Sequence, residues 1–417
     1  MTLLPRFLAR TVAAPECVGR AQPGTASFRR RLLAVAAAAP MLLAGTAAAR
    51  AQDGARAAPA ADAGGAPMLV IEDNDFLGPG GSDIQSAIPL LANPKVKVLG
   101  FTVATGDGWE NAEAAHLLRF LEIAKRTDVP VADGAVYPLI NSVERMKLWE
   151  KQYGTIPWKG AWGALGSIDD VPHEQPPLPD LPEGRPSTRT ARENAAAFLI
   201  REVHAHPHQV TIVETGPMTN LALAIRTDPT FAADARQLVF MGGLLDRNMM
   251  AVTGNADWAS DFNFIFDPEA AHIALTAPWP RIVSLGNVAD AVMMDDALMN
   301  RIHAVKTPVT DYLKRFQAPL PLWDEMATAV AVDPGLIRNS TEAFMDVDIA
   351  DGPDYGRAHV WKKELAPRNM GLQPVIVVDR IDEKRFVDGF VRDAQRLGTP
   401  GGAAPGTDRS AEHPPGR

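Results

Sequence analysis

Short runs of β-branched and apolar residues alternate with longer helical patterns along most of this 417-residue chain. Continuous apolar runs of this kind are expected to be strands buried on both faces, with helices such as Glu110–Lys125 and Glu193–His206 between them. This order predicts an α/β fold with a mostly parallel central sheet and helices on both faces. The expected strands are Met68–Glu72, Val96–Val103, Val129–Ala132, Val210–Thr215, Gln237–Met241, Arg281–Leu285 and Pro374–Asp379.

Length alone allows one large α/β domain or two smaller ones. A hydrophobic content of 46% is enough for a sizeable core. The strand and helix patterns fall within residues 67–395, which we predict to be a single domain without internal repeats. Residues 52–66 are mostly Ala, Gly and Asp, and residues 396–417 are rich in Gly, Pro and charge, so both segments are expected to be disordered.

The first 51 residues have the pattern of a cleaved export signal. Arg29, Arg30 and Arg31 precede the apolar run Leu32–Leu43, and the small-x-small motif Ala49–Ala51 follows. The arginine pair before two leucines resembles a twin-arginine signal, and a general secretory signal with a long basic region is the alternative. The apolar run is too short for a transmembrane helix. We therefore expect a periplasmic or secreted protein without stable membrane insertion.

Charge and cysteine content exclude two classes of function. The whole chain carries 41 basic and 50 acidic residues, and the leader contains seven Arg and one Glu, so the mature chain has a net charge of −15. That sign disfavours a nucleic-acid partner. Cys17 is the only cysteine and lies in the leader, so the mature protein has neither disulfides nor thiolate chemistry.

Acidic residues gather directly after the first expected strand. In an open α/β sheet, ligands bind beyond the carboxyl ends of the strands. The segment Asp73–Asp83 holds three carboxylates around a glycine-rich turn, which is the oxygen-rich environment that Ca²⁺ or Mg²⁺ requires. Turn formation and helix capping are the alternative roles for these residues. The phosphotransfer carboxylate pair of haloacid dehalogenases also follows a first strand, but it expects Thr or Val where Leu77 stands here.

Five segments occur in the same order as in one known family of enzymes. They are Asp73–Asp83, Thr102–Asp107, Glu214–Asn220, the glycine- and asparagine-containing stretch Met241–Ala270, and Trp323–Ala327. In these segments the chain resembles the inosine-uridine preferring nucleoside hydrolases, from about Met68 to Val391. The resemblance implies a single nucleoside-hydrolase-like α/β domain, a small-molecule nucleoside substrate, a calcium ion and a homo-oligomer, either dimer or tetramer.

The resemblance also assigns roles to individual residues. It implies that Ca²⁺ is held by the side chains of Asp75, Asp83 and Asp324 and by the backbone carbonyl of Thr215. It implies that the ribose hydroxyls are bound by Asn255, Asp261 and Asn263, with Asp73 and Asp107 supporting the cage and the 2′-hydroxyl side. Ser82 would lie at the substrate.

Three positions depart from the family pattern. Ser82 stands where the family has the first of two adjacent aspartates, Asp107 replaces an Asn, and Asp261 replaces a longer Glu. These changes affect the ribose contacts more than the metal ligands. Ser82 can hydrogen-bond a hydroxyl but brings no charge.

Breaking an N-glycosidic bond requires a stabilised positive charge on the ribose, an activated water and a leaving base. Carboxylate-bound calcium would anchor the 2′- and 3′-hydroxyls and lower the pKa of its water. The family's second aspartate, here Asp75, would then act as general base.

The residue before the last calcium-binding aspartate is Trp323, where many family members have a His that acts as general acid. The purine-preferring branch has Trp at this position and stacks it on the base, which predicts a purine preference here; a core aromatic is the alternative. Trp162 or Trp158 would supply a second ring. Both lie in Tyr137–Arg189, a long Pro- and Trp-rich segment expected to be a lid or pocket wall.

Two other functions remain open on the sequence alone. Ser82 and the missing His are compatible with a periplasmic nucleoside- or ribose-binding protein that has lost catalysis, although such a protein would not need Asp75 and Asp83. A metal phosphoesterase is disfavoured because no His ligands or phosphate-binding Lys occur in a motif. His204, His206 and His208 are closely spaced, but we expect them to be solvated at a helix–strand turn.

Overall fold

The computed structural model describes residues 66–243 and 261–399. The chain divides into two units, Met1–Ala57 and Ala58–Arg417, and all the elements below belong to the second. The expected export signal, almost all of both expected disordered segments, and Asn255 lie outside the described residues. No helix in the described ranges is both long and apolar enough to cross a membrane.

The described part of the chain forms a nine-stranded sheet in the order β3-β2-β1-β4-β5-β6-β9-β7-β8. The strands are β1 (Met68–Asn74), β2 (Val96–Val103), β3 (Val131–Asp133), β4 (Val210–Glu214), β5 (Gln237–Met241), β6 (Ile282–Leu285), β7 (Ile337–Val347), β8 (Ala358–Trp361) and β9 (Pro374–Ile381). The first six and β9 are parallel, whereas β7 is antiparallel to both of its neighbours. The predicted α/β class with a mostly parallel sheet is confirmed.

Strands β7 and β8 were not expected from the sequence. The first half of β7 carries exposed polar side chains from Asn339 to Glu342, so it lacks the continuous apolar run of a strand covered on both faces. Both strands lie at the antiparallel end of the sheet, where one face can remain in water. Their hydrophobic pattern is therefore weaker than that of the central strands.

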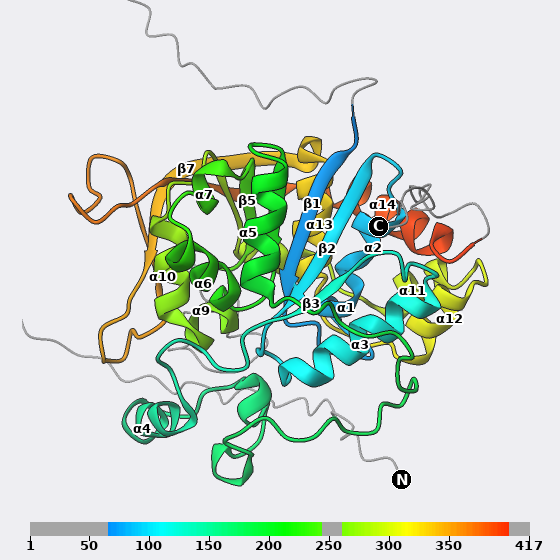
Figure 1. The fold of residues 1–417 in the computed structure, drawn as a ribbon, viewed down its shortest axis with the longest axis horizontal. Helices are drawn as coiled ribbons and strands as arrows, with labels where there is room; N and C mark the ends of the chain where they lie inside the picture. The colour runs from blue at the N-terminus through cyan, green and yellow to red at the C-terminus, as the bar shows by residue number, and fades with distance from the viewer. Residues whose placement is uncertain (1–65, 244–260, 400–417) are drawn as a thin grey trace, which may run out of the picture. The chain divides into compact units, whose positions relative to one another are not determined.

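Helices cover both faces of the sheet (Figure 1). One set comprises α5 (Ala195–Ala205), α6 (Thr219–Thr227), α7 (Phe231–Asp234) and α10 (Pro268–Thr276), which pack with one another. The other comprises α1 (Ser82–Gln85), α2 (Ala87–Ala92), α3 (Glu110–Ile123), α11 (Asp296–Ile302), α12 (Pro308–Arg315), α13 (Trp323–Val332) and α14 (Glu383–Arg396). Two further helices, α4 (Val143–Tyr153) and α9 (Phe262–Phe266), lie beyond these sets in the chain segments that follow β3 and β5.

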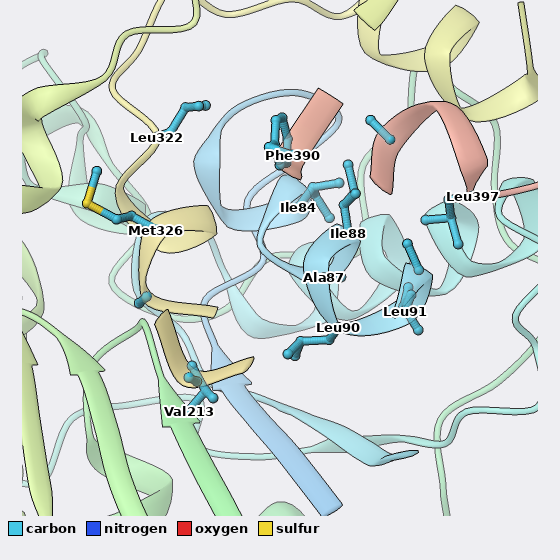
Figure 2. Packing of buried hydrophobic residues seen from close by; sticks show 14 of the residues in the cluster. Ile84, Ala87, Ile88, Leu90, Leu91, Val213, Leu322, Met326, Phe390 and Leu397 are labelled. Atoms are coloured by element: carbon cyan, nitrogen blue, oxygen red, sulfur yellow. The ribbon is translucent and has the colours of Figure 1, made fainter. Parts of the chain in front are cut away.

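Successive strand residues point into two separate hydrophobic clusters. On β1, Val70 belongs to the cluster beneath α2, α13 and α14, while its neighbour Ile71 belongs to the cluster beneath α5, α6 and α10. This alternation is the two-residue period of a strand buried on both faces. Figure 2 shows the first cluster, in which Ile88 of α2 lies near Phe390 of α14.

The chain reverses its direction of travel across the sheet beside β1. It runs outward from β1 through β2 to β3 and then returns to place β4 on the other side of β1. The register pairs Asp73 with both Thr102 of β2 and Glu214 of β4, so these three strands end together. Such a switch point, at the carboxyl ends of parallel strands, is where open α/β sheets bind ligands.

Candidate active site

Asp75 follows β1 and belongs to an acid cluster that also includes Asp73, Asp83, Asp107 and Asp324. It is 2% exposed, and its Oδ2 accepts a hydrogen bond of 2.7 Å from the backbone N–H of Asp107 after β2. Glycines flank the carboxylate: a Cβ at Gly106 would lie 2.0 Å from Oδ2, and one at Gly216 would lie 2.9 Å from Oδ1. Glycine at both positions lets two loops approach this carboxylate closely.

The start of α1 meets the start of α13 next to Asp75. The charge of Asp324 is among the causes that raise the pKa of Asp83, so these two side chains lie close together. The Ser82 hydroxyl accepts from the backbone N–H of Asp324 at 2.8 Å and donates to Oε2 of Glu325 at 2.6 Å. Two expected ligands of the metal, far apart in the sequence, are thereby brought together.

Thr215 presents its backbone carbonyl at the end of β4. The Asn263 side-chain amide donates to that oxygen at 2.8 Å and to the carbonyl of Met241 at 3.3 Å. Because a carbonyl oxygen has two lone pairs, the one on Thr215 can accept this bond and still face a cation. Asn263, expected at the ribose, is thus brought next to an expected calcium ligand.

Asp261 is the N-cap residue of α9. Its Oδ1 accepts from the N–H of Phe264 at 3.0 Å, and its Oδ2 accepts from the N–H of Gly243 at 2.7 Å. In the structure this side chain therefore holds the backbone that follows β5 against the first turn of α9. Its expected contact with the ribose stays a prediction.

Asp73 lies near the end of β1, and Asp107 follows β2. Asp73 is fully buried, and its Oδ1 accepts from Thr102 at 2.6 Å and from the side-chain amide of Asn220 at 2.8 Å. Asp107 is half-buried and accepts a hydrogen bond from the indole N–H of Trp158. Burial raises the pKa of each of these two carboxyls to about 6.

The acids raise one another's pKa values because they are buried together. Burial, followed by the charges of Asp107 and Asp83, holds the pKa of Asp75 well above its usual range. Burial likewise raises the pKa of Asp324, to which the charges of Glu325 and Asp75 add. Burial, followed by the charges of Asp107 and Asp324, also raises the pKa of Asp83. Within residues 66–243 and 261–399, none of these three side chains forms an ion pair with Lys, Arg or His. The acid cluster thus brings several carboxyl groups together without a described counter-ion.

Four further buried acids were not singled out from the sequence. Glu72, Glu113, Glu214 and Glu325 are each 0% exposed, and burial raises the pKa of each one. Glu72 and Glu214 lie within apolar strands, where sequence alone does not show which carboxylates face a site. Glu325 follows Asp324 directly, and only its bond to Ser82 reveals its position.

The oxygen atoms of the acid cluster and the carbonyl of Thr215 suit a hard divalent cation. Carboxylates and a carbonyl are the oxygen ligands that Ca²⁺ prefers. Buried oxygens without a hydrogen-bond partner in the described residues include Oδ2 of Asp324, Oε1 of Glu325 and Oδ2 of Asp73. No three His, Cys, Asp or Glu side chains of the described ranges are already arranged around a metal position. The acids would have to move toward a cation for it to bind among them.

Two half-buried tryptophans are tied by their indole N–H groups to acids, whereas Trp162 is in a core. Trp323 is the first residue of α13 and donates to Oδ1 of Asp290 at 2.7 Å. Trp158 donates to Asp107. Trp162 is 1% exposed, and its ring centroid lies 4.5 Å from that of Phe266 in a separate hydrophobic cluster. Of the two tryptophans considered as a second ring, Trp158 is the one hydrogen-bonded to Asp107 of the acid cluster.

The long segment from Tyr137 to Arg189 is fastened to the domain by hydrogen bonds and an ion pair. Oε1 of Glu122 accepts four hydrogen bonds from the backbone and hydroxyl groups of Ser187 and Thr188. Glu183 pairs with His116, and both side chains are buried. The segment also contains α4, which the sequence pattern did not predict.

The three histidines before β4 lie at the surface, as expected. The side chain of His204 is 44% exposed and pairs with Asp228 at 2.8 Å. His206 is partly exposed and His208 is exposed. These positions carry no site.

Comparison with known proteins gives one consistent family. Residues 70–388 match the family model described as inosine-uridine preferring nucleoside hydrolase. The chain is 32% identical over 326 residues to the Schizosaccharomyces pombe protein C800.11, covering 73% of this chain and 79% of that protein. It is 31% identical over 245 residues to probable uridine nucleosidase 2 of Arabidopsis thaliana, covering 58% and 67% respectively. A purine-preferring ribonucleoside hydrolase from Gardnerella vaginalis has a similar fold, with a TM-score of 0.62, 21% identity, and coverage of 79% of this chain and 99% of that one.

Proposed function

This chain belongs to the inosine-uridine preferring nucleoside hydrolase family, and from that premise we propose that it is a calcium-dependent hydrolase of ribonucleosides that favours purines. Membership makes it an N-glycosyl hydrolase acting on a small-molecule nucleoside. One observation carries the finer proposal: Asp75, Asp83 and Asp324 lie close enough to raise one another's pKa values at the switch point of the sheet, without a described counter-ion, and Thr215 follows β4 at the same edge.

The proposed metal site consists of the side chains of Asp75, Asp83 and Asp324 with the carbonyl of Thr215. When bound there, calcium supplies positive charge that orients the sugar hydroxyls and lowers the pKa of water. The protein's own part is to hold the ligands in place: Ser82 fixes the backbone of Asp324, and Asn74 donates to the carbonyl of Asp83 at 3.2 Å.

Asp75 is the proposed general base. Its raised pKa, caused first by burial and then by neighbouring acids, makes this carboxylate a better proton acceptor than an exposed aspartate. One of its oxygens accepts the backbone N–H of Asp107, so the orientation of the carboxylate is fixed. The surrounding acids create a negative potential that suits the positive charge developing on the ribose.

Leaving-group departure is assigned to stacking because no His precedes Asp324. Trp323 occupies that position, with its ring held by the bond to Asp290. A purine stacked on this indole has an imidazole nitrogen that can take a proton from solvent, whereas a pyrimidine has none. The relatives include a probable uridine nucleosidase and a purine-preferring hydrolase, so purine preference rests on Trp323.

The test is a panel of nucleosides incubated with purified protein and assayed for free ribose. Inosine, adenosine and guanosine should be cleaved much faster than uridine and cytidine, and prolonged EGTA treatment should abolish ribose release. Equal rates for inosine and uridine would contradict the purine preference. Full activity in metal-stripped protein would contradict the role of calcium.

We also propose that the mature enzyme acts outside the cytoplasm, as a homo-oligomer. The support for export is the basic and apolar pattern of residues 1–51. N-terminal sequencing of the protein recovered from the periplasm should show a mature chain that begins near Gln52. Light scattering would give the number of subunits.

A further inference from the structure

Glu325 is a fully buried acid beside the proposed calcium ligands. It lies in the first turn of α13, directly after Asp324, and is 0% exposed. Its Oε2 accepts the hydroxyl of Ser82 at 2.6 Å across 243 positions of sequence. Its Oε1 is buried and has no hydrogen-bond partner among the described residues.

Burial of this carboxylate has a cost that its described neighbours do not offset. A buried charge is costly unless it is paired or binds a metal. The start of a helix favours a negative charge only modestly. Within residues 66–243 and 261–399, Glu325 has no Lys, Arg or His ion-pair partner. Its charge instead adds to those that raise the pKa values of Asp83 and Asp324. A cation bound nearby would stabilise the ionised form of this buried acid.

Ser82 connects Glu325 to Asp324. Its hydroxyl accepts a hydrogen bond from the backbone N–H of Asp324 and donates one to the Glu325 carboxylate. In the nucleoside hydrolases that this chain resembles, an aspartate stands at the position of Ser82. The carboxylate missing from α1 therefore has a counterpart on α13, within hydrogen-bonding distance of the same position.

We propose that Glu325 supplies the negative charge that Ser82 lacks, and that the Ser82–Glu325 bond positions Asp324 toward the cation. The inference rests on the proposed calcium site. Glu325 is a positioning residue and a source of charge, and the direct ligands remain Asp75, Asp83, Asp324 and Thr215.

The experiment measures calcium affinity by isothermal titration calorimetry, together with the melting temperature in EGTA and in calcium. The variants of the purified protein are Glu325→Gln, Ser82→Ala and the double change Ser82→Asp with Glu325→Gln. Glu342→Gln, on the exposed part of β7, removes one carboxylate outside the acid cluster and serves as the control.

Glu325→Gln should weaken calcium binding about tenfold or more, since it removes one charge from a poorly solvated site. In EGTA its melting temperature should equal or exceed that of the wild type, because an amide avoids the cost of burying a carboxyl group that has no counter-ion. Ser82→Ala keeps every charge and should weaken binding less. The double change moves the carboxylate back to α1 and should restore much of the affinity, while Glu342→Gln should have wild-type affinity.

Two results would overturn the inference while leaving the calcium site intact. One is a calcium affinity of the Glu325→Gln variant that equals the affinity measured for the wild type. The other is a Glu325→Gln variant whose melting temperature falls equally in EGTA and in calcium, which indicates a purely structural role. If Glu325→Gln does not fold, unchanged calcium affinity in Ser82→Ala overturns the inference. A wild type that binds no calcium overturns the proposed metal and this inference with it.

Discussion

The backbone N–H of Asp107 donates to the carboxylate of Asp75 at 2.7 Å, joining the loops that follow two neighbouring strands. The bond occupies Oδ2, and the backbone of Gly216 closes on the side of Oδ1. Asp75 is therefore held from two directions before any substrate binds. Its charge and its surroundings can therefore be changed separately by substitution.

Replacing Asp75 with Asn tests the general base. The amide oxygen can still accept the N–H of Asp107, so the loop should keep its position while the ability to take a proton is lost. We expect kcat for inosine to fall by about 10² or more, as is typical when general base catalysis is removed. Calcium content must be measured in the same sample, because Asp75 is also a proposed ligand. A near-normal rate at full calcium content would transfer the role to Asp83 or Asp73.

Gly106→Ala tests the close approach of the loop to Asp75. The new Cβ would lie 2.0 Å from Oδ2, so the carboxylate or the loop must move. We expect a large loss of kcat and weaker calcium binding. Gly352→Ala is the matched control, since a Cβ there has no heavy atom within 4 Å. Equal activity of the two variants would show that the position of Asp75 is not critical.

The stability of the metal-free enzyme should decrease as pH rises. Burial raises the pKa of Glu72 to about 8 and that of Asp73 to about 6, whereas unfolded carboxyls titrate near about 4. Folded protein therefore retains protons that unfolded protein has lost, and this stabilisation disappears as pH passes through 6 and then 8. In EGTA the melting temperature should fall between pH 5 and 8.5, and calcium should reduce the fall.

Glu72→Gln provides the control for this pH dependence. The amide does not ionise, so the decline in melting temperature above pH 6 should be smaller than in the wild type. A melting temperature that stays level or rises with pH in EGTA would contradict the buried-acid explanation.

Trp323 should determine the preference for purines. Stacking of a base on an aromatic ring contributes on the order of 1 to 3 kcal/mol. Trp323→Ala should therefore reduce kcat/KM for inosine by about 10-fold to 100-fold while leaving calcium affinity unchanged, because the indole is not a ligand. Trp323→Phe keeps a ring and should retain more activity. If the alanine change affects neither inosine nor uridine, Trp323 serves only in packing.

Trp158 and Trp162 should respond differently to substitution. Trp162 is buried against Phe266, so Trp162→Ala should lower the free energy of unfolding by about 3 to 5 kcal/mol, as for other large core residues. Trp158→Phe removes the bond to Asp107 and should alter KM for purine nucleosides with little effect on the melting temperature. Chemical denaturation and steady-state kinetics on both variants would distinguish these effects.

Much of the fold could be predicted because the central strands are buried on both faces. The expected ranges Val96–Val103 and Gln237–Met241 match β2 and β5 to the residue. Strand β7 could not be found in this way because half of it is polar and exposed. Its pairing with β9 and β8 depends on contacts between segments distant in sequence, which a local pattern does not contain.

The site was predictable only where acids follow strands in a motif. Asp75 and Asp83 come from one such segment, and the switch point of the sheet brings them to Asp324. Glu72 was missed because it lies inside an apolar strand, and Trp162 was expected at the site because a loop without periodicity does not reveal burial. Side-chain direction in such segments is set by tertiary packing.

The hydrogen bond between Ser82 and Glu325 closes a loop of 243 positions, which has consequences for how the protein folds and unfolds. Contacts this distant in sequence carry a large loop-closure entropy and form late. The helix that bears Asp324 and Glu325 docks on residues near the start of the domain, so the acid cluster is complete only when the chain is almost native. A cation bound there would act after the folding transition state. It would prolong the lifetime of the folded enzyme by slowing unfolding, with little effect on the rate of folding.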